Sequence, residues 1–193
     1  DDIIKAYNDV LNQYSSAGRY YHNINHILFC LEEAEFVLGK IVWQSQRAAL
    51  TWSIWFHDIV YDIYSKTNEQ DSANLAIRWA KELGIEKLGY EAAELILLTN
   101  HNGAQPNTLV AKYLLDIDLA ILGKSKYEFE IYDAQIRAEY AHVRDEIYYP
   151  ARKETLQSLC DRKNIYYTEA FRDKYEASAR ENLIRTIENY ANR

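Results

Sequence analysis

The sequence contains few of the residues that interrupt helices or cross-link chains. It has two prolines, six glycines, two cysteines and no methionine among 193 residues. No pair of alternating strands joined by a hairpin signal occurs, which argues against a protein built on sheets. The cysteines, Cys30 and Cys160, cannot build a disulfide framework and form no Cys-x-x-Cys pair. We therefore expect a reducing, cytoplasmic setting.

Long apolar runs and blocks of basic residues are also missing. No run approaches the roughly 18 consecutive apolar residues that a membrane span needs, so we expect no membrane span. The formal net charge is 22 − 29 = −7. Proteins that bind the backbone of nucleic acids usually present a broad basic surface. We therefore expect no nucleic-acid polymer as a partner, whereas a local basic pocket for one small phosphorylated substrate stays compatible with this charge.

Apolar residues recur at helical spacing along most of the chain. The pattern predicts helices over 2–14, 23–38, 45–61, 69–83, 89–100, 108–122, 126–143, 150–161 and 168–191. Pro150 fits the first turn of its helix. The first helix has an apolar side formed by Ile3, Ile4, Tyr7, Val10 and Leu11. With 48% hydrophobic residues the chain can build a core. The predicted fold is all-α, a single-domain bundle of seven to ten helices.

The most informative feature is the His57-Asp58 pair, which lies in the apolar stretch 48–61. This stretch is apolar nearly all round, so as a helix it should be largely buried. Burying a carboxylate is unfavourable unless a charge or hydrogen-bond donors meet it. A bound cation is the simplest common partner for an adjacent imidazole and carboxylate.

Other polar residues occupy equally apolar segments. His26 lies within 24–29, and Asp116 and Asp118 lie within 113–122. Together with His57-Asp58 they supply imidazole and carboxylate ligands from three segments. Such mixed ligation suits a divalent Mn, Fe, Co, Ni or Zn ion, and Mg less well. The alternative is that each His donates to a nearby carbonyl, and each Asp caps a helix or pairs with an arginine.

The order His26, His57-Asp58 and Asp118 resembles the HD-domain superfamily of metal-dependent phosphohydrolases. In that family a lone His, an adjacent His-Asp pair and a later Asp bind one metal. Asp118 is the better match for the last ligand, because Ile117-Asp118-Leu119 fits the family's apolar-Asp-Leu setting. Asp116 is the spare candidate.

The resemblance is closer to one branch, the predicted HD-superfamily phosphohydrolases of uncharacterised function. The matching stretches are 20–27, 55–62, 68–73 and 115–123. They fall within 19–123, and weaker similarity runs on to the end. The resemblance implies one HD-type helical domain over 1–193 and a divalent metal cofactor. It also implies hydrolysis of a phosphate mono- or diester, of a nucleotide-like small molecule, by metal-activated water.

Two acidic residues are candidates for the general acid or base that such hydrolysis uses. Asp62 follows Asp58 by one turn, so within one helix both would share a face. Glu69 begins the next predicted helix and could point into the same cavity. For each, the alternative is an ordinary charge near the end of a helix.

Substrate contacts call for cationic donors and aromatic rings. His22 precedes His26 by four residues and would share its helical face, and His101 stands before the turn-rich segment 102–107. Each of these two His could instead have an ordinary structural role, and an arginine or lysine could simply be solvated or paired. His142, on a charged helix, is expected at the surface. The remaining candidates are Lys66, Arg137, Arg19 and Arg152 for phosphate, and Trp55, Tyr61 and Tyr64 for a nucleobase.

Two other functions stay open at this point. One is a non-catalytic nucleotide- or metal-binding regulatory module on the same fold. The other is a metal-dependent oxygenase on an HD-like fold. The 17 tyrosines are also compatible with a homodimer.

Overall fold

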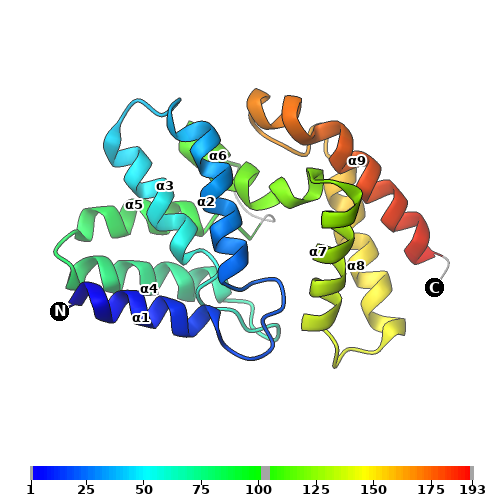
Figure 1. Ribbon diagram of the computed structural model, residues 1–193, viewed down its shortest axis with the longest axis horizontal. Helices are drawn as coiled ribbons and strands as arrows, with labels where there is room; N and C mark the ends of the chain where they lie inside the picture. The colour runs from blue at the N-terminus through cyan, green and yellow to red at the C-terminus, as the bar shows by residue number, and fades with distance from the viewer. Residues whose placement is uncertain (1, 101–104, 192–193) are drawn as a thin grey trace. The chain divides into compact units, whose positions relative to one another are not determined.

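The computed structural model describes residues 2–100 and 105–191, and within these ranges all regular structure is helical (Figure 1). The α-helices are α1 (Asp2–Tyr14), α2 (Ile24–Leu38), α3 (Gln44–Phe56), α4 (Asn68–Glu82), α5 (Glu86–Ile96), α6 (Leu109–Asp118), α7 (Lys126–Glu139), α8 (Asp145–Cys160) and α9 (Glu169–Ala191). A 3₁₀ helix, η1 (Leu119–Gly123), follows α6. The predicted all-α class is confirmed, and none of the described helices has the length and apolarity to cross a membrane.

The chain divides into two compact units, Asp1–Asp118 and Leu119–Arg193. The first contains α1 to α6, and the second contains η1 and α7 to α9. All four residues that the sequence predicts as metal ligands belong to the first unit. A single domain over 1–193 stays a prediction.

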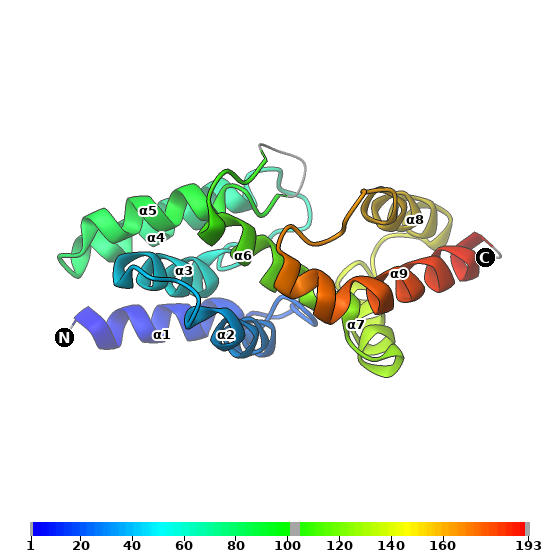
Figure 2. The same ribbon diagram turned by 90° about the horizontal axis from the view of Figure 1, so that it is seen from above.

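Helix α3 is the centre of the first unit, where it contacts α2, α4, α5 and α6. Figure 2 shows it between the α4–α5 pair and the layer of α1 and α2. No residue from 48 to 61 is exposed, which confirms that this stretch is buried. The helix ends at Phe56 rather than at 61, because the backbone of 58–60 forms hydrogen bonds with side chains from other segments.

Helices α4 and α5 approach each other closely through small residues. A Cβ added at Gly89 would lie 2.5 Å from the Cβ of Ala80 and 3.1 Å from the Cα of Ile77. Ala73 and Ala76, like Ala80, are buried on the same helix. This close packing places the beginning of α4 next to the segment that follows α3, with which its side chains form hydrogen bonds.

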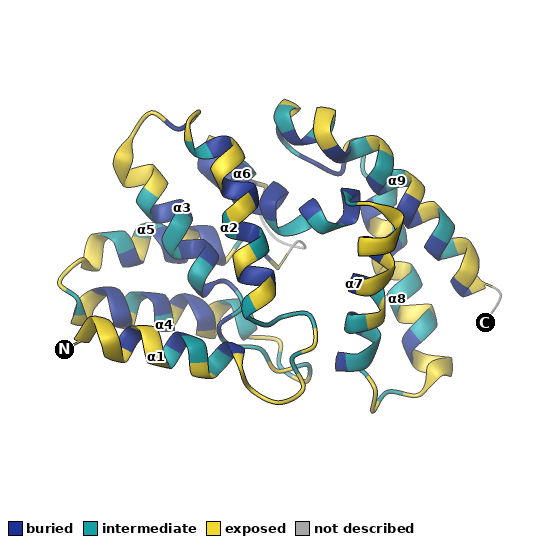
Figure 3. Ribbon diagram, in the orientation of Figure 1, coloured by how far each residue is buried: buried dark blue, intermediate teal, exposed yellow. Residues whose placement is uncertain are grey.

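Helix α1 buries Val10 of its predicted apolar side but leaves the start of that side exposed. The exposed apolar residues at its start are Ile3, Ile4 and Tyr7 (Figure 3). The buried residues follow at a spacing of four: Ala6, Val10 and Tyr14. The Tyr14 hydroxyl donates to the carbonyl of Trp55 at 3.0 Å. This buried contact orients the helix. The more hydrophobic residues at its start, Ile3, Ile4 and Tyr7, therefore stay exposed.

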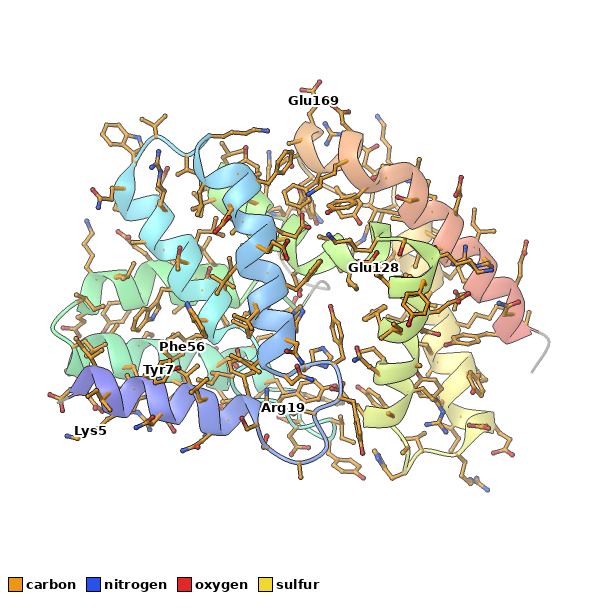
Figure 4. All side chains as sticks on the ribbon, in the orientation of Figure 1. Lys5, Tyr7, Arg19, Phe56, Glu128 and Glu169 are labelled. Carbon is orange, nitrogen blue, oxygen red and sulfur yellow. The ribbon has the colours of Figure 1, made fainter. Side chains whose placement is uncertain are left out.

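The second unit is organised by buried hydrogen bonds to η1. Helix α9 packs against α8 and η1. The buried Asn182 side chain donates to the carbonyls of Leu122 and Lys124 at 2.9 Å each. Helix α7 begins with a capping box between Ser125 and Glu128, the latter labelled in Figure 4.

Pro150 lies inside α8, beyond its first turn, so the predicted helix start is wrong. The helix begins earlier, at Asp145 and Glu146. Carboxylates at a helix N-terminus interact favourably with the unpaired backbone N–H groups and the helix dipole. Those local charges start the helix, and the proline is accommodated within it.

Candidate metal centre

The structure brings together the four residues predicted as metal ligands. They are His26 in α2, His57 at the end of α3, Asp58 immediately after it and Asp118, the last residue of α6. The two imidazole Nε2 atoms lie 3.1 Å apart. His26 Nε2 lies 3.4 Å from Asp58 Oδ2 and 3.3 Å from Asp118 Oδ1. His57 Nε2 lies 3.2 Å and 3.5 Å from the same two oxygens.

These separations are those of ligands that share one ion. Metal–nitrogen and metal–oxygen bonds of about 2.0–2.2 Å place neighbouring ligand atoms about 2.8–3.6 Å apart in octahedral or tetrahedral geometry. The imidazoles are almost fully buried, whereas the side chains of Asp58 and Asp118 are 22% and 16% exposed. The cluster is therefore sealed on its imidazole side and reachable by solvent at its carboxylates.

A backbone hydrogen bond orients the ring of His57. Its Nδ1 lies 2.9 Å from the carbonyl oxygen of Ile54. A carbonyl can only accept, so Nδ1 carries the proton, and the lone pair of the neutral ring is on Nε2. This is how metal-binding histidines are commonly oriented. The carbonyl partner, which the alternative interpretation expected, thus also prepares Nε2 to bind an ion.

A fifth residue, Cys30, belongs to the same cluster. The donor atoms of His26, Cys30, His57 and Asp118 all lie within 4.8 Å of one another, so this group could hold a metal ion. Cys30 is one helical turn after His26 and is buried. We did not identify it from the sequence, although the spacing of four from His26 was a usable signal.

The neighbouring charges set the protonation of the cluster. Burial alone would lower the pKa of His26 and of His57. For His26 this is outweighed by Cys30 and the carboxylates, and for His57 chiefly by Asp58, so both pKa values rise well above 6.5. Burial would raise the pKa of Asp58, but the two imidazoles hold it well below 3.8. The metal-free cluster therefore retains protons on its imidazoles more readily than free histidines do, and a bound metal ion would replace such protons.

Arg19 holds the backbone of the segment that carries Asp58. Its guanidinium donates to the carbonyls of Asp58 at 2.6 Å, Ile59 at 2.7 Å and His22 at 3.0 Å. Figure 4 labels Arg19 in the segment after α1, and also Phe56, where α3 ends. The sequence suggested Arg19 as a phosphate donor. In the structure its guanidinium makes these three backbone bonds, so we assign it to positioning Asp58.

Polar residues at the start of α4 hold the same segment from the other side. The Val60 N–H donates to Ser72 Oγ at 3.1 Å. The Asn68 side chain accepts from the Asp62 N–H at 3.0 Å and donates to the Asp62 carbonyl at 2.8 Å. The irregular segment therefore has a defined path.

The predicted acid and base candidates lie outside the cluster of ligands. Because α3 ends at Phe56, Asp58 and Asp62 share no helical face, and that geometric prediction is wrong. The exposed Asp62 carboxylate accepts from the Tyr64 N–H. Glu69 lies in the first turn of α4, and Lys66 is exposed before it. Their roles in catalysis and substrate binding stay predictions.

His22 lies beside the cluster, although not for the predicted reason. Helix α2 begins at Ile24, so His22 and His26 do not share a helical face. The His22 ring instead stacks on Tyr61 at 4.2 Å between centroids and lies 6.0 Å from the ring of His26. Its charge also helps to lower the pKa of Asp58. His22 is therefore placed to influence what binds at the carboxylates.

The other predicted substrate residues lie elsewhere in the chain. His101 falls outside the described residues. Arg137 lies in the second unit, where it donates to Tyr140, Val143 and Asp145. Within that unit, Arg152 bonds the Tyr132 hydroxyl, and His142 is exposed, as predicted. Asp116, the spare ligand, is buried, and the pKa of Tyr113 is raised first by burial and then by the Asp116 carboxylate.

The chain matches no known family model, no curated protein and no solved structure. The comparisons therefore assign neither a family nor an activity. A functional conclusion has to come from the site itself. The geometry that bears on it is the convergence of two imidazoles, two carboxylates and one thiol within the first unit.

Proposed function

We propose that this protein is a metal-dependent phosphohydrolase with an HD-type site, acting on a phosphate mono- or diester of a small, nucleotide-like molecule. The observation that supports this proposal is the set of donor separations of 3.1–3.5 Å among His26, His57, Asp58 and Asp118. Two carboxylates offset the charge of a divalent ion, and two imidazoles suit Mn, Fe, Co, Ni or Zn.

The partial exposure of the two carboxylates suits a site at which a substrate reaches a bound metal ion. A divalent ion bound there would polarise a phosphoryl oxygen and lower the pKa of a bound water molecule, which makes that water a better nucleophile. The buried imidazoles hold one side of the site, and the partly exposed Asp58 and Asp118 leave the other side open to a substrate. Arg19 keeps Asp58 in place through its backbone.

The candidates for the remaining functions come from the segments on either side of α3. We assign phosphate binding to His22, beside Asp58, and to Lys66 in the segment before α4. Tyr64, whose side chain is 75% exposed, offers a ring for stacking on a nucleobase. Asp62 and Glu69 are the candidates for proton transfer, and His101 remains a further candidate for substrate binding.

Hydrolysis by the metal-loaded protein tests the proposal. The protein is stripped of metal by a chelator, reloaded with Mn²⁺ and assayed with a panel of nucleotides and a generic phosphodiester. We expect turnover to fall more than about 100-fold in Asp58→Ala. Loss of a residue that only hydrogen-bonds a metal ligand already costs about 10–100-fold, and loss of a ligand itself should cost more. Asp173→Ala, an exposed aspartate of α9, is the matched control and should keep full activity.

Three results would overturn the proposal and point elsewhere. Tight nucleotide binding without turnover would identify a regulatory module. Oxygen consumption by the Fe²⁺-loaded protein, without phosphate release, would identify an oxygenase. Failure of the wild-type protein to bind any divalent ion would remove the metal centre itself.

A further inference from the structure

The sulfur of Cys30 lies close to the donor atoms of the cluster. Its Sγ lies 3.7 Å from both ring nitrogens of His26 and is within 4.8 Å of the donor atoms of His57 and Asp118. The residue is 1% exposed. A buried free cysteine usually acts as a small apolar side chain. This one also lies near two imidazoles and a carboxylate.

The position of the sulfur agrees with that of an additional ligand. Zinc–sulfur and zinc–nitrogen bonds of about 2.3 Å and 2.0–2.1 Å in a tetrahedral arrangement separate sulfur from nitrogen by about 3.5 Å. The observed distance from Sγ to Nε2 of His26 is 3.7 Å, close to this separation. Because Cys30 and His26 lie one turn apart on α2, the helix itself holds both donors on one side.

We propose that the Cys30 thiolate is a further donor to the ion and makes the site selective for thiophilic divalent metals, such as Zn²⁺ and Co²⁺, over Mg²⁺. The proposal rests on the metal centre of the proposed function and goes beyond it. Thiolate ligands favour softer metals, whereas Mg²⁺ favours oxygen ligands. On binding, the S–H bond breaks, the proton leaves to solvent and the sulfur electron pair forms the bond to the metal, with no change of oxidation state.

Cobalt substitution tests this directly on the full chain. Co²⁺ is added to the metal-free protein, and the near-ultraviolet spectrum is examined for a sulfur-to-cobalt charge-transfer band. We expect the band in the wild type and in Cys160→Ser, which removes the only other cysteine. Cys30→Ser should bind Co²⁺ without the band, and its preference for Zn²⁺ over Mg²⁺ should fall by about tenfold or more.

The outcomes separate this inference from the proposed function. One equivalent of bound Co²⁺ without a charge-transfer band in the wild type would overturn the role of Cys30 and leave the metal centre intact. A band that persists in Cys30→Ser would overturn it as well. No Co²⁺ binding at all would overturn both proposals. Should Cys30→Ser fail to fold, the spectra of the wild type and Cys160→Ser decide alone.

Discussion

The Nε2 atoms of His26 and His57 face each other across 3.1 Å, although 31 positions separate the two residues in the chain. Both rings are buried, and each also lies within 3.5 Å of a carboxylate oxygen of Asp58 and of Asp118. Two buried imidazoles in this arrangement need either protons or a cation between them and the carboxylates. That requirement makes the stability of the protein depend on metal and on pH.

Loss of one imidazole should abolish stabilisation by metal. A ligand present at 100 times its dissociation constant stabilises the folded state by about 2.7 kcal/mol. We expect the wild-type melting temperature to rise on adding Zn²⁺ or Mn²⁺ to the metal-free protein, and His57→Gln to show no such rise. His142→Gln, at an exposed histidine, is the matched control. An equal rise in all three proteins would refute the assignment of His57 as a ligand.

Removal of Arg19 should weaken both the fold and the site. In Arg19→Ala three part-buried backbone carbonyls lose a hydrogen-bond donor, and each such bond contributes about 0.5–1.5 kcal/mol to stability. Metal affinity should fall about 10–100-fold, which is the usual effect of losing a residue that orients a metal ligand without binding the metal itself. Urea unfolding and metal titration measure the two effects. Arg78→Ala, at a half-exposed side chain, should change the free energy of unfolding by about 0.5 kcal/mol or less. Unchanged metal affinity in Arg19→Ala would contradict the positioning role.

The pKa shifts predict a pH dependence for the metal-free protein. The folded-state pKa values of His26 and His57 are raised, so their stabilising effect is complete below 6.5 and is lost as pH rises through the folded values. The pKa of Asp58 is lowered, so its effect is present above 3.8 and is lost as pH falls through its folded value. We therefore expect the metal-free protein to lose stability on the alkaline side.

Bound metal should reverse the alkaline part of this profile. An ion requires neutral imidazoles, so its affinity increases as the two histidines lose their protons. The rise in melting temperature caused by Zn²⁺ or Mn²⁺ should therefore grow with pH until both histidines are deprotonated. Thermal unfolding with and without metal across a pH series measures it. A shift that is constant across the series would show that no histidine releases a proton on binding.

The close approach of α4 and α5 should not tolerate a side chain at Gly89. In Gly89→Ala the new Cβ would lie 2.5 Å from the Cβ of Ala80, and overpacking of this kind costs about 1–3 kcal/mol. Gly39→Ala is the matched control, because nothing lies within 4 Å of the added Cβ and its φ of −64° suits alanine. Chemical denaturation compares the two variants. Equal stability of Gly89→Ala and the wild type would show that the helix pair relaxes freely.

The positions of the helices were predictable because hydrophobic periodicity is a local property of the chain. The ends of helices were less predictable. The stretch 48–61 is uniformly apolar, yet its helix stops at Phe56 because Arg19 and Ser72 bond the backbone that follows. Those partners lie far away in sequence, so no local pattern reveals them. The geometric argument for Asp62 as catalyst failed for this reason.

The amino-acid sequence by itself determined the helical class and identified the polar residues that had to lie in apolar segments. This is possible because both follow from residue type and spacing along one segment. Only the tertiary structure decided that four of these residues lie within hydrogen-bonding range of one another, that Cys30 lies beside them and that Arg19 bonds the backbone around Asp58. Convergence depends on how helices pack across the whole unit, and packing arises from contacts between segments that are distant in the chain.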